Sequence, residues 1–276
     1  MKDFFRRLAK FLIFGIPHVD IRANITQINY NSMFVDRKIL ITGGDGGIGF
    51  SIAKKCCKEG AKVVIVGRNE EKLRIAKEEL GENAQILKWD VLDVESMHEL
   101  YDEAERLVGS PIDSLVNNAG ISLHEGNITN VSLSNYEKQM NINLRGAYFL
   151  SKIFVERRDK TKTNNILFIT SERGLQADDL PYGISKAGIN QLTRGLSRRF
   201  YKSGICVNAI APGVTTSELT GIQKTDNLYL ETAHSERVFL AEEIAEVAYF
   251  LLSDASNCVS GEIIACDAGN YLSAYY

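Results

Sequence analysis

A tyrosine and a lysine four positions apart are the first residues in this 276-residue sequence that could do chemistry. They are Tyr182 and Lys186, in the stretch LPYGISKAG. In a helix this spacing puts both side chains one turn apart on one face. A free phenol has a pKa of about 10, too high for proton exchange at neutral pH, and a neighbouring ammonium would lower it. The pair is therefore a candidate acid–base site, although a solvated helix face beside an unrelated tyrosine has the same pattern.

A glycine-rich loop, TGGDGGIG at residues 42–49, joins a predicted strand to a predicted helix. It fits two fingerprints of dinucleotide binding. The general one, G-x-G-x-x-G, uses Gly44, Gly46 and Gly49. The second, T-G-x-x-x-G-I-G, uses Thr42, Gly43, Gly47, Ile48 and Gly49. Both place backbone N–H groups and a helix N-terminus against a pyrophosphate, and both need small residues for that close approach.

The end of the second predicted strand bears on which dinucleotide binds. That strand ends with Gly67 and Arg68, where a carboxylate for an adenosine 2′-hydroxyl usually stands. A guanidinium suits a 2′-phosphate, so Arg68 favours NADP over NAD. Asp45, inside the glycine loop, could bind a ribose hydroxyl or repel the extra phosphate, and NAD stays possible.

Apolar runs alternate with helical patterns along the chain. Strands are predicted at 37–44, 61–68, 84–91, 112–120, 164–171, 205–213 and 261–269. Helices are predicted at 49–60, 69–80, 94–109, 134–158, 182–202 and 241–253. Continuous apolar strands separated by helices predict an α/β, doubly wound Rossmann fold of about seven parallel strands with helices on both faces.

The same pattern sets the domain organisation. Residues 36–276 are predicted to form a single NAD(P)-binding catalytic domain, and residues 1–35 an N-terminal extension. Residues 214–240 are the long irregular stretch, where such folds place a substrate lid. The extension has a basic start and an apolar run too short to span a bilayer. We favour its packing against the domain or a neighbouring subunit over contact with a membrane surface.

Composition argues against several other classes of protein. A net charge of −3 and a pI of about 5.9 give no basic field for nucleic acid. The five cysteines are odd in number and form no C-x-x-C pair, which indicates reduced, buried thiols in a cytoplasmic protein. The four histidines show no metal-ligand spacing, so no metal site is predicted.

From about Arg37 to Gly269 the sequence resembles the short-chain dehydrogenase/reductase family in its compact single-domain form. The resemblance rests on motifs in order: TGGDGGIG, WDV, NNAG, NINLRG, ITS, YGISK, NAIAPG and a closing DAG. Each motif alone is modest, and the ordered set is highly specific. The Y-x-x-x-K spacing selects the T-G-x-x-x-G-I-G interpretation of the glycine loop.

The resemblance implies roles for individual residues. Tyr182 would be the general acid/base, and Lys186 would lower its pKa and bind the nicotinamide ribose. Ser171 would hydrogen-bond the substrate oxygen, and Asn143 would hold a water that links Lys186 to solvent. The implied cofactor contacts are Gly43, Asp45, Gly47, Ile48, Gly49, Arg68, Asp90, Val91, Asn118, Ala119, Gly120, Tyr182, Lys186, Pro212, Gly213, Val214 and Thr215.

The sequence also departs from the family pattern. Ser171 lies only 11 positions before Tyr182, about two fewer than is common in the family. In that tight loop Asp178 and Asp179 either favour a polar or cationic substrate or are simply solvated, and we favour solvation. After APG, the residues at 215–217 (Thr, Thr, Ser) could each bind the cofactor carboxamide.

These features predict an NADP-dependent oxidoreductase that passes a hydride between nicotinamide C4 and a carbonyl or secondary-alcohol carbon. The substrate could be an acyl-carrier-protein thioester, although no basic entrance patch for an acidic carrier is evident, or a sugar or other polar carbonyl compound. The alternative is a catalytically silent dinucleotide-binding sensor or scaffold, which would not need a tuned phenol. Family members commonly form dimers or tetramers through the helices at about 134–158 and 182–202, so a homodimer or homotetramer is expected.

Overall fold

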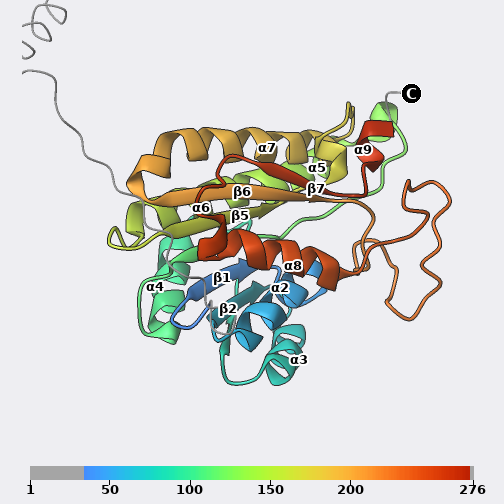
Figure 1. The fold of residues 1–276 in the computed structure, drawn as a ribbon. Helices are drawn as coiled ribbons and strands as arrows, with labels where there is room; N and C mark the ends of the chain where they lie inside the picture. The colour runs from blue at the N-terminus through green and yellow to red at the C-terminus, as the bar shows by residue number, and fades with distance from the viewer. Residues whose placement is uncertain (1–33, 274–276) are drawn as a thin grey trace, which may run out of the picture.

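A seven-stranded, fully parallel sheet forms the centre of the molecule (Figure 1). The structure is a computed structural model, and it describes residues 34–273. The strands are β1 (Lys38–Thr42), β2 (Lys62–Gly67), β3 (Ala84–Lys88), β4 (Ser114–Asn117), β5 (Asn164–Ile169), β6 (Ile205–Pro212) and β7 (Ile263–Cys266). Their order across the sheet is β3-β2-β1-β4-β5-β6-β7. The chain order reverses direction between β1 and β4, where open α/β sheets bind ligands.

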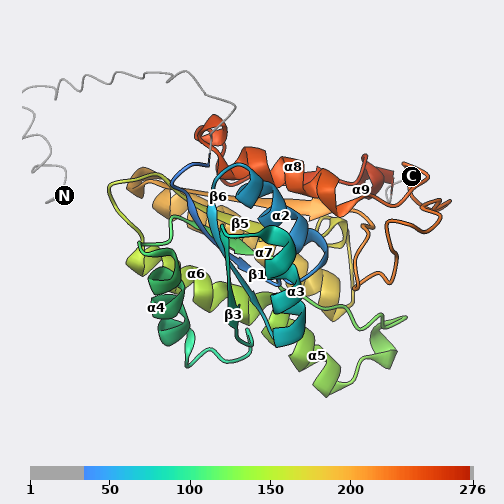
Figure 2. The same cartoon turned by 90° about the horizontal axis from the view of Figure 1, so that it is seen from below.

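Helices cover both faces of this sheet, which confirms the predicted doubly wound fold (Figure 2). They are α2 (Gly47–Lys58), α3 (Glu70–Leu80), α4 (Met97–Val108), α5 (Leu133–Met140), α6 (Ala147–Arg157), α7 (Pro181–Phe200), α8 (Ala241–Leu252) and α9 (Asn270–Ser273). Successive strand residues point to opposite faces. Ile39 and Ile41 of β1 therefore pack with α2, α3 and α8, whereas Leu40 packs with α4, α6 and α7.

The prediction of one continuous helix at 134–158 is wrong, because a π-helical turn interrupts it. This turn, η2 (Asn141–Gly146), separates α5 from α6. A π turn carries more residues than an α turn and often marks a functional site. A Cβ on Gly146 would lie 2.9 Å from the carbonyl oxygen of Val91, so the turn packs tightly beneath the loop after β3.

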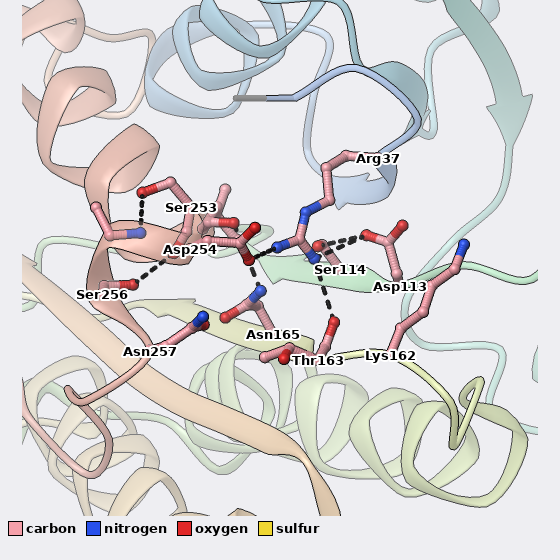
Figure 3. Close-up of polar contacts among 12 residues, drawn as sticks. Arg37, Asp113, Ser114, Lys162, Thr163, Asn165, Ser253, Asp254, Ser256 and Asn257 are labelled. Atoms are coloured by element: carbon pink, nitrogen blue, oxygen red, sulfur yellow. Dashed lines mark hydrogen bonds and ion pairs between the residues drawn. The ribbon is translucent and has the colours of Figure 1, made fainter. Parts of the chain in front are cut away.

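A polar cluster, buried at Asp113 and exposed at Asp254, lies at the amino ends of the strands (Figure 3). Arg37 donates to Asp254 Oδ1 at 2.5 Å and to the carbonyl oxygen of Thr163 at 3.2 Å, and it lies 3.8 Å from Asp113. Burial raises the pKa of Asp113, against the opposing effect of Arg37. The cluster joins β1, β4, β5 and the turn after α8.

The structure bears on the expected N-terminal extension and on the expected burial of the cysteines. Phe34, within the predicted extension, is fully buried with its ring centroid 4.7 Å from that of Tyr249, and residues 1–33 lie outside the described part. The prediction of buried thiols is wrong for Cys258, which is exposed in the loop after α8. None of the helices between residues 34 and 273 is both long and apolar enough to cross a bilayer.

Candidate active site

A cavity of about 1070 Å³ opens at the carboxyl ends of the strands. The predicted site residues that line it are Gly43, Asp45, Gly47, Ile48, Arg68, Asp90, Val91, Asn118, Ala119, Gly120, Ser171, Tyr182, Lys186, Pro212, Gly213, Val214 and Thr215. Gly49 and Asn143 do not line it. The cavity therefore gathers segments that are far apart in sequence, from residue 43 to residue 220, around one space.

The glycine loop fits a bound pyrophosphate. Gly43 and Gly47 have positive φ values of 63° and 51°, which favour glycine. A Cβ on Gly49 would lie 2.2 Å from the carbonyl oxygen of Gly43, so helix α2 and the loop approach too closely for any side chain there. No side chain caps the first turn of α2, and no acidic residue stands in it. Its N–H groups are thus suited to an anion.

The turn after β4 braces this loop. The amide nitrogen of Asn118 donates to the carbonyl oxygens of Thr42 and Gly43 at 3.0 and 2.8 Å. Thr42 Oγ1 in turn accepts from the backbone N–H groups of Asn118 and Ala119, both at 3.1 Å. The NNAG motif therefore fixes the glycine loop with its side chain and presents its backbone to the cavity.

Asp45 and Arg68 lie near one another on the cavity wall, at the end of β2. Arg68 is exposed, and its side chain makes no hydrogen bond or ion pair with any residue that the structure describes. The carboxylate of Asp45 packs against Gly67, where an added Cβ would lie 2.7 Å from Oδ2. An acid carried by the glycine loop thus occupies the end of β2, directly before Arg68.

Ser171, Tyr182 and Lys186 converge at the other end of the cavity. Ser171 follows β5, accepts at Oγ from the backbone N–H of Arg173 at 3.3 Å and lines the cavity together with Tyr182. Pro181 starts α7 with its fixed φ, and Tyr182 follows in the first turn. Lys186, one turn later, is 5% exposed and donates from Nζ to the carbonyl oxygen of Ile169 at 2.9 Å.

The electrostatics of this group differ from the expectation for Tyr182. Desolvation raises the pKa of Tyr182, and the Ser171 hydroxyl and the charge of Arg173 oppose that shift. The expectation that Lys186 lowers the Tyr182 pKa is not met in this structure. Burial lowers the pKa of Lys186 to about 8, and its ammonium is directed to the Ile169 carbonyl. The physical reason is that burial disfavours the charged form of each group, and Lys186 is not among the groups that shift the pKa of Tyr182.

Asn143 lies behind the cavity wall, in the π-helical turn. Its Oδ1 accepts from the N–H of Ile121 at 2.8 Å, and its Nδ2 donates to Ser185 Oγ at 3.1 Å. A Cβ on Gly120 would lie 3.2 Å from Lys186 Nζ and 3.4 Å from Asn143 Oδ1. Because Gly120 has no side chain, Lys186 Nζ and Asn143 Oδ1 can both lie close to this turn.

Two of the three hydroxyls considered for the carboxamide line the cavity, namely Thr215 and Ser217. Thr216 does not line the cavity, and its Oγ1 accepts from the N–H of Ala241 at 3.2 Å, at the start of α8. Thr215 Oγ1 donates to the carbonyl oxygen of Gly213 at 2.9 Å, which fixes its orientation beside the cavity.

The solvated interpretation of Asp178 is also wrong. Its side chain is 6% exposed, pairs with Arg173 Nε at 2.5 Å and accepts from the N–H of Leu180 at 2.9 Å. A buried carboxylate needs such partners. Asp178 therefore shapes the loop before α7, whereas Asp179 is exposed.

Sequence reasoning missed the residues that close the cavity. Glu218, in the 214–240 segment, binds Lys72 of α3 at 2.6 Å. On the other side, His124 Nε2 lies 3.2 Å from the carbonyl oxygen of Leu219. These residues all line the cavity. Partners so far apart in sequence leave no local signal, and only their meeting in space identifies them.

Comparisons with known proteins agree with this geometry. The profile of a family described as Enoyl-(Acyl carrier protein) reductase matches residues 43–270. The 3-oxoacyl-[acyl-carrier-protein] reductase FabG of Aquifex aeolicus is 30% identical over 240 residues, which are 84% of this chain and 96% of that protein. The cis-4-hydroxycyclohexanecarboxylate dehydrogenase of Sinomonas cyclohexanicum is 32% identical over 242 residues, 86% of this chain and 97% of that protein.

Solved structures agree as well. A 3-ketoacyl-(acyl-carrier-protein) reductase from Brucella melitensis, complexed with NADH, has a TM-score of 0.79 and 25% identity and covers 86% of this chain and 99% of its own. A short-chain type dehydrogenase/reductase from Mycobacterium ulcerans has a TM-score of 0.80 and 27% identity, covering 87% and 91%.

The fold and the cavity define an NAD(P)-dependent oxidoreductase on a Rossmann sheet. The chain belongs to the short-chain dehydrogenase/reductase family, which confirms the resemblance drawn from the ordered motifs.

Proposed function

We propose that this protein is an NADP-dependent reductase of a small carbonyl compound, with Tyr182 as its proton donor. The observation that carries the proposal is that Ser171, Tyr182 and Lys186, with the lysine one turn after the tyrosine on α7, line the same cavity as the glycine loop. In the reducing direction a hydride adds to the carbonyl carbon, and the oxygen takes a proton to become an alcohol. A binding protein without turnover would have no use for that arrangement.

The bound cofactor supplies the hydride, and the chain's own residues supply the rest. Ser171 Oγ and Tyr182 Oη would hold the substrate oxygen between them, and Tyr182 would release its proton to that oxygen as negative charge develops there. Lys186 would then pass a proton back to the phenolate and would itself take a proton from solvent through a water held by Asn143.

Arg68 supports NADP as the preferred cofactor. Its guanidinium, at the end of β2, has no partner within residues 34–273 and suits a 2′-phosphate. Asp45 beside it opposes a second negative charge, so NAD stays the less favoured cofactor. The relatives from Aquifex aeolicus and Brucella melitensis are named as reductases of 3-oxoacyl or 3-ketoacyl groups on an acyl carrier protein. We extend to this chain the reduction of a carbonyl group, and not the carrier-bound substrate.

Separate titrations with NADPH and NADH, followed by nicotinamide fluorescence, test the cofactor assignment. Tighter binding of NADPH is the expected result, and a panel of ketones and aldehydes with NADPH then tests turnover. Preference for NADH would assign Asp45 to the ribose and contradict the role of Arg68. Binding of neither would contradict the proposal, and binding without any turnover would leave the sensor or scaffold as the function.

A further inference from the structure

Arg173 is a cation at the substrate end of the cavity. It lies in the turn η3 (Glu172–Gly174), two residues after Ser171, and lines the cavity together with Ser171 and Tyr182. Its backbone N–H donates to Ser171 Oγ at 3.3 Å. The same turn therefore presents both the serine hydroxyl and the guanidinium.

One edge of this guanidinium is held in place. Arg173 Nε donates to Asp178 Oδ2 at 2.5 Å, and the Asp178 side chain is 6% exposed. A Cβ on Gly183 would lie 2.1 Å from Asp178 Oδ2, so the glycine makes room for the carboxylate. The Arg173 side chain is 43% exposed, and its two terminal Nη groups make no hydrogen bond or ion pair within residues 34–273.

The other charged groups at this end have partners of their own. Glu172 Oε2 accepts from Asn270 Nδ2 at 2.8 Å, which turns that carboxylate toward α9. Lys186 Nζ donates to the carbonyl oxygen of Ile169. Arg68 and Lys72 stand at the opposite, glycine-loop end of the cavity, and Lys72 is paired with Glu218. Arg173 is thus the cation with free donors beside Ser171 among the described residues.

We infer that Arg173 binds a carboxylate of the substrate, so that the compound reduced here is a keto acid or a related oxo acid. The inference rests on the proposed function and names its substrate class. A guanidinium presents its N–H donors in a planar fork that matches a carboxylate, and such charge-assisted bonds are stronger than neutral ones. Asp178 fixes the guanidinium through Nε and leaves the terminal fork for the ligand.

A matched pair of probes tests this inference, 4-oxocyclohexanecarboxylate and its methyl ester, each reduced with NADPH. The measured quantity is the ratio of kcat/KM for the acid to kcat/KM for the ester. Arg173→Gln should lower that ratio about 10- to 100-fold, and Arg173→Lys should restore part of it. Arg198→Gln removes an exposed charge from α7 outside the cavity and should keep the wild-type ratio.

The ratio separates this inference from the proposed function. An unchanged ratio in Arg173→Gln, with both probes still reduced, would overturn the inference and leave the reductase intact. If neither probe is turned over, the inference is tested by binding instead. Calorimetry then measures the affinity of the NADPH-saturated protein for cyclohexanecarboxylate and for cyclohexanecarboxamide. Preference for the carboxylate that Arg173→Gln removes would support the inference, and equal or absent binding would overturn it. Failure to bind NADPH at all would instead contradict the proposed function.

Discussion

The ammonium of Lys186 lies 5.7 Å from the ring centroid of Tyr182, and its hydrogen bond goes to the carbonyl oxygen of Ile169 rather than to the phenol. The two residues are neighbours on α7, as their spacing predicted. Ser171 lines the cavity beside Tyr182, and its Oγ accepts from the N–H of Arg173 at 3.3 Å. Substrate and cofactor would enter a cavity that Ser171, Tyr182 and Lys186 line together.

The burial of Lys186 predicts a pH-dependent stability. Its folded-state pKa of about 8 lies below the unfolded value, so the folded protein favours the neutral amine. Stability should therefore rise as pH increases from about 8 to about 10.5, by at most about 3 kcal/mol, relative to Lys186→Met. Urea unfolding of both proteins at pH 7 and pH 10 measures this difference. If the difference in unfolding free energy between the two proteins is the same at both pH values, burial of the Lys186 ammonium does not destabilise the fold.

Removing Arg37 should destabilise the protein more at neutral than at acid pH. Asp113 is buried, and its pKa is already raised, so losing the opposing cation would raise it further. When the pKa of a carboxyl is higher in the folded than in the unfolded protein, the free energy of unfolding falls as pH rises above the unfolded pKa of about 3.9. Arg37→Met should cost about 1–3 kcal/mol at pH 7 and less at pH 4.

The double variant Arg37→Met with Asp113→Asn is the control for that prediction. It removes the charge that Arg37→Met leaves unpaired, so it should recover part of the stability at pH 7 and lose the pH dependence. Denaturant titrations of the three proteins at both pH values provide the comparison. An equal loss at both pH values in the single variant would assign the effect to packing.

Replacing Arg68 should change the choice of cofactor. Arg68→Ser should raise the Kd of NADPH about 10- to 100-fold and leave that of NADH nearly unchanged. Asp45→Asn is the matched variant at the same place. It should tighten NADPH if Asp45 repels the 2′-phosphate, and weaken NADH if Asp45 binds the ribose. A similar loss for both cofactors in Arg68→Ser would place the arginine elsewhere than on the 2′-phosphate.

The exposed aromatic pair on α6 predicts where the subunits meet. Tyr148 and Phe149 are 50% and 37% exposed, and their ring centroids lie 5.4 Å apart. If the chain forms the dimer or tetramer expected from its family, a double change to aspartate should reduce the mass measured by light scattering. Ile75→Asp on α3, 53% exposed, is the control and should not. A wild-type monomer would remove the basis for this prediction.

Local sequence patterns predicted the strands and most helices because each is marked by its own apolar run or cap. Asn69 is an example, since its side chain accepts from the N–H of Lys72 at the start of α3, as a capping asparagine should. The π turn at Asn141 could not be predicted, because its residues fit a continuous helix and only packing against Val91 distinguishes them.

The sequence predicted which residues line the cavity better than it predicted their burial, their pKa shifts and their partners. The burial of Asp178 depends on Arg173 folding back over it and on the space at Gly183. The raised pKa of Tyr182 depends on desolvation by segments from across the chain. The Lys72–Glu218 pair joins residues 146 positions apart. Each of these is a property of the assembled cavity.

Transfer of deuterium from NADPH labelled at C4 to the carbon of a ketone tests the central claim most directly. The wild-type protein should give an alcohol that carries the label, and Tyr182→Phe should do so about 10²- to 10⁴-fold more slowly while it still binds NADPH. Labelled alcohol formed equally fast by both proteins would contradict the role of Tyr182. An NADPH-bound wild-type protein that gives no labelled alcohol with any carbonyl compound in the panel would contradict the assignment as a reductase.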